Sequence, residues 1–126
     1  MSGLAFFDTH VLVYAEDASM PAKQERAASL ILEHRKSGTL VVSLQVLQAF
    51  FSVATRKLKV DPSAAQRKVE VLSRGNIVRF TEHDVIAAIE LHRLTQLSFW
   101  DAMIVHAARA VMRPFSTAKI WLMERR

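Results

Sequence analysis

A chain of 126 residues is long enough to close one hydrophobic core, and its 51% hydrophobic and 23% charged content excludes a disordered chain. No apolar run approaches the ~20 residues that span a bilayer, the lack of Cys excludes disulfides and thiolate metal sites, and three Gly leave no glycine-rich phosphate loop. The net charge of +5 is compatible with RNA, DNA or an acidic protein as partner, although a generic basic surface explains it more simply.

The N-terminal half of the chain predicts two rounds of strand and helix. Leu4–Phe7 has the pattern of a short buried strand, and a brief helix is expected after it. Pro21 suits the first turn of the next helix, which ends at Gly38. Residues 39–42 predict a second strand, and Ser43 offers an N-cap for a long helix. The apolar face of that long helix is expected at five positions: Leu47, Phe50, Phe51, Ala54 and Leu58.

The second half continues the alternation. Asp61 followed by Pro62 is a typical helix start, and residues 76–80 predict a third strand. Thr81–Asp84 and Ser98–Asp101 have the spacing of capping boxes and should each open a helix. Because strands alternate with helices, the sequence predicts an α/β fold with a mostly parallel sheet that is covered on both faces.

The chain shows no linker, internal repeat or low-complexity stretch, so residues 1–126 are expected to form one domain. No basic segment followed by a long apolar stretch stands at the N-terminus, and a signal peptide is therefore not expected. The absence of Cys fits a reducing, cytoplasmic environment.

Two aspartates stand where an apolar run gives way to a helix, Asp8 and Asp101. In α/β folds these points lie at the edge of the sheet where ligands bind. Carboxylates there can hold a hard cation such as Mg²⁺ or Mn²⁺, which supports phosphodiester cleavage by activating water and neutralising charge. Each residue also has a purely structural explanation, since Asp8 can cap the following helix and Asp101 can belong to a capping box with Ser98.

The stretches around these aspartates, Phe6-Phe7-Asp8-Thr9-His10 and Phe99-Trp100-Asp101-Ala102, resemble the first and third metal-binding motifs of the PIN-domain nucleases. In particular, they resemble those of the VapC-type toxins of toxin–antitoxin pairs, and the resemblance covers about residues 4–110. The resemblance implies a three-layer α/β/α domain, a Mg²⁺-dependent endoribonuclease that cleaves RNA, and neutralisation by a small antitoxin protein. It also implies a homodimer, with Asp8 and Asp101 holding the cation. His10 stands where that family usually has Asn.

The second acidic motif of that family, Ser-x-Gln-Val-Leu-x-Glu-Phe, is matched by Ser43–Phe50 except that Ala49 replaces the Glu. Helix spacing places Ala49 on one side with Gln45, Ser52 and Arg56, away from the apolar stripe. A Glu at this position would face a polar cleft, so Ala49 removes a ligand.

The fourth acidic motif of the family, similar to Glu-Asp-Leu-x-x-Gly, is absent from the tail after Ala110. No Asp occurs there, and Pro114 is expected to interrupt any strand. One hypothesis is that the tail is translated out of frame. Plausible codons for Ala118–Glu124, read two bases later, can encode Glu-Asp-Leu-Ala-His-Gly, and the shifted frame of the gene tests this directly.

Three functions remain open. The chain is a Mg²⁺-dependent endoribonuclease toxin, a catalytically inactive PIN-like domain that only binds RNA or an antitoxin, or an unrelated α/β binding module. Arg56 and Lys57 could contact an RNA backbone or simply form a solvated helix end. Several other residues have structural explanations, as helix starts (Asp61 and Asp84), solvated surface (Glu16, Asp17, Glu25 and Glu33) or core (Phe99, Trp100 and Met103).

Overall fold

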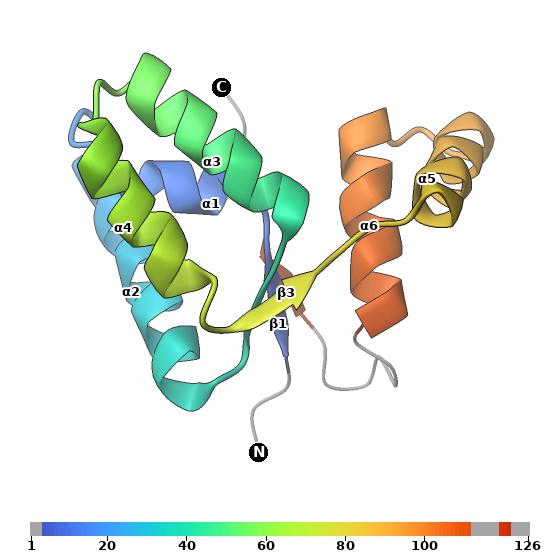
Figure 1. Ribbon diagram of the computed structural model, residues 1–126, viewed down its shortest axis with the longest axis horizontal. Helices are drawn as coiled ribbons and strands as arrows, with labels where there is room; N and C mark the ends of the chain where they lie inside the picture. Colours follow the sequence, from blue (N-terminus) through green and yellow to red (C-terminus); the bar gives the residue numbers. More distant parts are fainter. Residues whose placement is uncertain (1–3, 112–118, 122–126) are drawn as a thin grey trace.

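The computed structural model describes residues 4–111 and 119–121, in which strands alternate with helices (Figure 1). The strands are β1 (Ala5–Phe7), β2 (Leu40–Ser43), β3 (Asn76–Val78) and β4 (Lys119–Trp121). The helices are α1 (Thr9–Tyr14), α2 (Pro21–Ser37), α3 (Leu44–Arg56), α4 (Pro62–Leu72), α5 (Glu82–Leu94) and α6 (Phe99–Val111). Within this described part of the chain, none of the helices has the length and apolar character that crossing a membrane requires.

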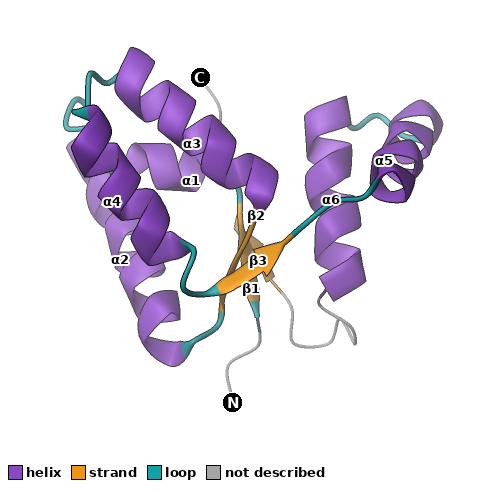
Figure 2. Cartoon of the chain, viewed as in Figure 1, coloured by secondary structure: helices purple, strands orange, loops and turns teal. Residues whose placement is uncertain are grey.

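The strands form one parallel sheet in the order β3-β2-β1-β4. Strand β1 is an interior strand, and its Ala5 pairs with Leu40 of β2 on one side and with Lys119 of β4 on the other. Helices α1 to α4 lie on one side of the sheet, and α5 and α6 lie on the other (Figures 1 and 2). The predicted three-layer α/β/α fold with a parallel sheet is therefore confirmed.

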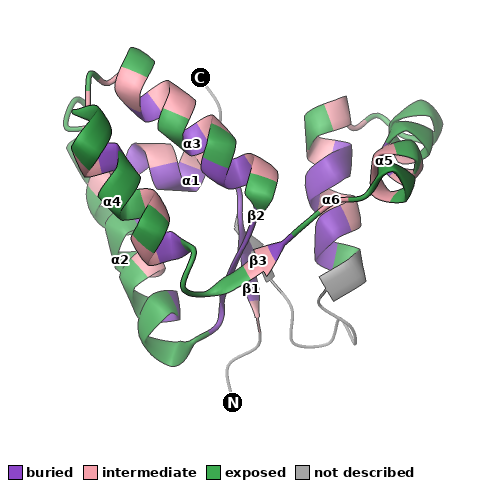
Figure 3. Cartoon of the chain, in the orientation of Figure 1, coloured by how far each residue is buried: buried purple, intermediate pink, exposed green. Residues whose placement is uncertain are grey.

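Alternate residues of the interior strands face opposite helix layers. Ala5 and Phe7 of β1 belong to the core under α1 to α4, whereas Phe6 packs with residues of α6. All three residues of β1 are 0% exposed, and Figure 3 shows that the buried positions gather along the strands and on the inward faces of the helices. Since both faces of the sheet are covered, β1 reads as a continuous apolar run, and its end is fixed firmly in the core.

Several residues that were predicted to begin or end helices do so in the structure. The Ser43 hydroxyl accepts a hydrogen bond from the Val46 backbone N–H at 3.0 Å, and Asp61 accepts one from the Ser63 backbone N–H at 3.1 Å. Gly38 ends α2 with a φ of +72°, in the left-handed region where side chains other than glycine are strained. These local signals were sufficient to place the starts of α3 and α4 and the end of α2 from the sequence.

Four expectations about the fold are wrong in detail. Phe51, expected on the apolar face of α3, is 39% exposed, and Leu58 lies beyond the end of that helix at Arg56. The third strand ends at Val78 because the residues after it lead directly into the N-cap of α5. Strand β4 forms although Pro114 was expected to interrupt any strand, because it begins beyond that proline. The rest of the altered tail, residues 112–118 and 122–126, lies outside the described residues.

The capping contact at the start of α5 makes stability depend on pH. The Thr81 backbone N–H donates to Asp84 Oδ2 at 2.8 Å, and His106 Nε2 lies 2.8 Å from Asp84 Oδ1. The Thr81 N–H first, and then His106, lower the pKa of the Asp84 carboxyl below its ordinary value of 3.8. Because the pKa is lowered in the folded state, this stabilisation is present above the unfolded pKa and is lost as the pH falls through the folded pKa.

We therefore expect Asp84→Ala to lower the free energy of unfolding by about 1 kcal/mol at pH 7, the usual effect of losing a capping interaction. The difference from wild type should be smaller at pH 2.5 than at pH 7, because the wild-type carboxyl gains a proton as the pH falls through its lowered folded-state pKa. Urea denaturation at the two pH values measures both effects. Glu82→Ala removes a neighbouring first-turn carboxylate and is the matched control. An equal loss for Asp84→Ala at both pH values would contradict the assignment.

Candidate active site

Asp8 lies at the carboxyl end of β1, where the sheet meets α1. Its backbone is extended (φ −76°, ψ 158°), and its Oδ1 accepts a hydrogen bond from the Thr9 backbone N–H at 2.6 Å. Its Oδ2 lies 3.0 Å from Nδ1 of His10. The side chain is buried, with only 2% of Asp8 exposed. These contacts fix the orientation of the carboxylate.

The surrounding sequence explains why Asp8 is held so firmly. The apolar residues of β1 anchor the chain before it, and Val11 and Leu12 bury α1 in the core directly after it. Asp is a preferred N-cap because its carboxylate satisfies a backbone N–H at the helix start. The predicted capping role of Asp8 is thus confirmed, and it leaves the carboxylate at the edge of the sheet where α/β proteins bind ligands.

A cavity of about 500 Å³ opens beside Asp8. Residues of α1, α3 and the first turns of α6 form its walls, together with residues of the loop after α1. Its polar lining residues are Asp8, Thr9, His10, Asp17, Gln45 and Lys57. The remaining lining residues are mostly apolar and come from the same elements. The cavity is large enough for a small ligand or one nucleotide, and it combines carboxylates with one lysine.

Ala49 lies in the wall of this cavity, as its position on α3 predicted. Gln45, one turn earlier, lines the same wall. Val53 and Lys57 continue the wall at the next two turns, whereas Ser52 and Arg56 were expected there. A longer acidic side chain at position 49 would therefore start from the cavity that Asp8 borders.

Asp101 lies in the first turn of α6 and is half-buried. Its backbone N–H donates to the Ser98 hydroxyl at 3.1 Å, so Ser98 caps the helix as expected. Trp100 and Ile104, on either side of Asp101 in the sequence, line the cavity. This turn of α6 thus borders the same cavity as Asp8, but Asp101 itself is not among the described lining residues, and the shared binding of one cation by the two aspartates remains a prediction.

Sequence reasoning missed two cavity residues. Asp17 was expected to be solvated surface, but it is half-buried in the cavity wall, and its Oδ1 accepts hydrogen bonds from the Ser19 backbone N–H and hydroxyl at 3.0 and 2.6 Å. Trp100 was expected in the core, yet it is 58% exposed. Trp100 stands in the first turn of α6, before the buried residues of that helix, and this position was the one sequence signal for its exposure.

The donor set near Asp8 fits a weakly held Mg²⁺ better than a fully caged metal. Among residues 4–111 and 119–121, no three His, Cys, Asp or Glu side chains lie together in a way that could hold a metal ion. Mg²⁺ usually keeps several waters and takes only one or two carboxylates, and substrate phosphates complete its shell. Asp8 can supply one such carboxylate, and Asp101 is the candidate for the second.

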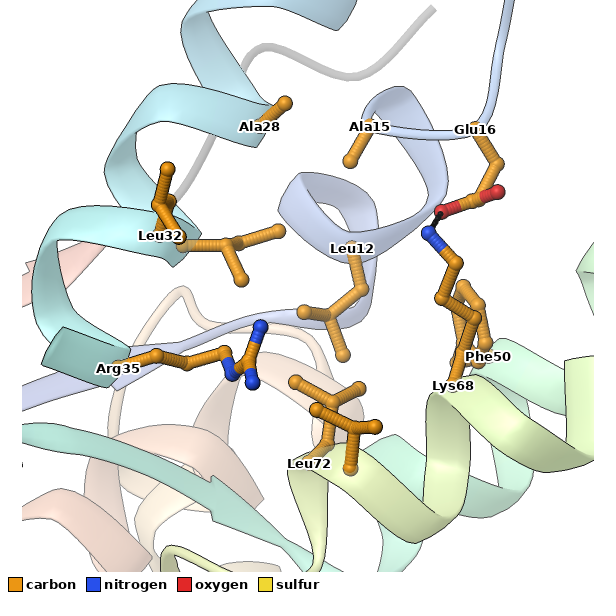
Figure 4. A pocket seen from close by; sticks show the side chains of 11 residues that line it. Leu12, Ala15, Glu16, Ala28, Leu32, Arg35, Phe50, Lys68 and Leu72 are labelled. Carbon is orange, nitrogen blue, oxygen red and sulfur yellow. Dashed lines mark ion pairs between the residues drawn. The ribbon is translucent and has the colours of Figure 1, made fainter.

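A second cavity, of about 160 Å³, lies between α1, α2, α3 and α4 (Figure 4). Its only carboxylate among the described lining residues, Glu16, is paired with Lys68 at 2.9 Å. Leu12, Leu72 and other apolar side chains form most of the remaining wall. Because its one acidic group is already neutralised by a lysine, this cavity is less suited to a metal ion than the cavity at Asp8.

A parallel α/β/α domain with a carboxylate at the end of an interior strand is a common arrangement for ligand-binding and catalytic proteins. The family model described as "PIN domain" matches residues 5–111, and the chain therefore belongs to the PIN-domain family. Membership in this family indicates nuclease activity in general, and PIN nucleases generally depend on divalent metal ions. The comparison with curated proteins returns no match.

Proposed function

We propose that this PIN domain is a Mg²⁺- or Mn²⁺-dependent endoribonuclease and the toxin of a VapC-type toxin–antitoxin pair. Asp8 and Asp101 are proposed as its metal ligands and catalytic residues. The observation that carries the proposal is Asp8, a buried carboxylate at the end of β1 that lies in the stretch resembling the family's first motif and lines the 500 Å³ cavity. Its position combines a place in the cavity lining with a fixed orientation, which catalysis requires.

The residues at the cavity would have separate tasks in the proposed reaction. Asp8, whose carboxylate contacts the Thr9 N–H and His10, would hold the cation together with Asp101 of α6. A bound divalent ion supplies an activated water and neutralises charge on the phosphate. Lys57 lines the cavity with a positive charge that can meet the RNA backbone.

The proposed partners follow from the same reading. RNA is proposed as the substrate and a small antitoxin protein as the inhibitor. The active form is proposed to be a homodimer in which residues 1–126 of each chain form a single domain. Its proposed location is the cytoplasm. The net charge of +5 supports an anionic partner of either kind.

A second candidate function is an inactive PIN domain that binds RNA or an antitoxin without cleaving. The observation that favours it is Ala49, which lines the cavity at the position where the family has a Glu. Fewer carboxylates bind a divalent ion more weakly. Binding without cleavage would then be the remaining activity.

RNA cleavage in EDTA, Mg²⁺ and Mn²⁺ tests the proposal. We expect cleavage with either ion and none in EDTA. Asp101→Asn should lower the rate about 10- to 100-fold, the range seen when even outer ligands of a metal are lost. The substitution keeps the cap of α6, since the Ser98 contact uses the backbone N–H of residue 101. RNA binding without cleavage at any metal concentration would favour the inactive domain.

A further inference from the structure

Trp100 is a large apolar side chain left outside the core at the mouth of the candidate active site. It is 58% exposed and lines the cavity next to Asp101. Burying a tryptophan removes about 150–250 Å² from water, so leaving one exposed costs stability that a ligand can recover. Tryptophan is enriched at binding interfaces because it combines a large apolar ring with one polar N–H.

Trp100 is held by a rigid part of the protein. The residues that follow it in α6, Ala102, Met103 and Ile104, are at most 7% exposed. The Phe99 ring packs against the indole with a centroid distance of 5.4 Å and an angle of 59°. The indole is therefore positioned by a buried helix and a neighbouring ring, so that little ordering is needed when it binds a flat ligand.

The cavity also offers the groups that the rest of a nucleotide needs. Lys57 can contact a phosphate, and Asp8, a proposed metal ligand, lines the same cavity. A base that stacks on Trp100 would place its own backbone phosphates within the cavity. Bases stack on aromatic side chains regardless of their identity, because every base has a π-face.

We infer that Trp100 stacks on a base of an unpaired RNA strand and thereby positions the neighbouring phosphate for Asp8 and Asp101. This inference rests on the proposed ribonuclease function. Paired bases within a duplex have both faces covered by their neighbours, so the stacking site selects single-stranded RNA. Trp100 is therefore a positioning residue, and its substitution should change the affinity for RNA.

Binding in EDTA tests the inference independently of cleavage. The probes are a fluorescein-labelled hexa-adenylate RNA and a hexamer of the same ribose-phosphate backbone that lacks bases. We expect Trp100→Ala to weaken binding of hexa-adenylate about tenfold, the usual effect of losing one stacked base, and to leave the abasic hexamer unaffected. Leu94→Ala is the control, because Leu94 is exposed at 78% and is not part of the cavity lining.

A spectroscopic readout distinguishes stacking from a structural role. Binding of hexa-adenylate should quench tryptophan fluorescence in the wild type, and Trp100→Phe should remove most of this quenching while retaining part of the affinity. Equal losses on both hexamers, or no binding of either, would overturn the inference. If cleavage depends on Mn²⁺ but Trp100→Ala binds hexa-adenylate as tightly as the wild type, stacking is refuted and the ribonuclease function stands. If binding depends on the bases and on Trp100 but no cleavage occurs, stacking stands and the ribonuclease function is refuted.

Discussion

Asp8→Asn is expected to lower the rate of metal-dependent RNA cleavage by at least about 100-fold, since even outer-shell partners of metal sites are worth about 10- to 100-fold. The substitution removes the negative charge that the proposed cation needs. Asn is as good an N-cap as Asp, so the Thr9 contact at 2.6 Å and the fold should be retained. Initial rates with saturating Mn²⁺ measure the effect, and thermal denaturation verifies folding.

The matched control is Asp61→Asn. Asp61 is the N-cap of α4, as Asp8 is of α1, and accepts a hydrogen bond from the Ser63 backbone N–H, but it is exposed and is not part of the lining of the cavity at Asp8. Both variants lose one charge at a helix start, and only Asp8→Asn alters the candidate site. Full activity in Asp8→Asn would show that the cleavage comes from another site or from a contaminant, and the ribonuclease proposal would be abandoned.

Features that local sequence determines were predictable. Ser43 and Asp61 cap their helices through contacts within three residues, and Gly38 ends α2 with a positive φ. The layer order also followed, because strands alternate with helices and a parallel sheet must be covered on both faces. Helix spacing was enough to place Ala49 in a cavity wall.

Features that depend on distant parts of the chain were not predictable. The exposure of Phe51 and of Trp100 depends on which surfaces the neighbouring helices cover, and an apolar residue looks the same in a sequence whether it is covered or not. Strand β4 forms by pairing with β1, more than a hundred residues earlier, and its three residues carry little pattern of their own. Asp17 reaches the cavity only because the loop after α1 borders it.

Ala49→Glu is expected to raise the affinity for Mn²⁺ about tenfold or more. The new carboxylate starts in the cavity wall near Gln45 and adds a further negative charge to a site that Asp8 borders. Two unit charges 4 Å apart interact by about 4 kcal/mol near a protein surface, and a tenfold gain needs only about 1.4 kcal/mol of this. Calorimetric titration of Mn²⁺ into the protein measures the affinity, and RNA cleavage should increase in parallel.

The charge argument also predicts what happens without metal. A Glu at position 49 repels Asp8, so the metal-free variant should unfold at a lower temperature than the wild type. Mn²⁺ should reverse this loss of stability because it binds the folded state. Ala49→Gln tests the added volume without charge. Gln48→Glu adds the same charge at an exposed neighbouring position of α3. If Gln48→Glu raises the affinity as much as Ala49→Glu, the gain is general electrostatics, and position 49 has no special relation to the cation.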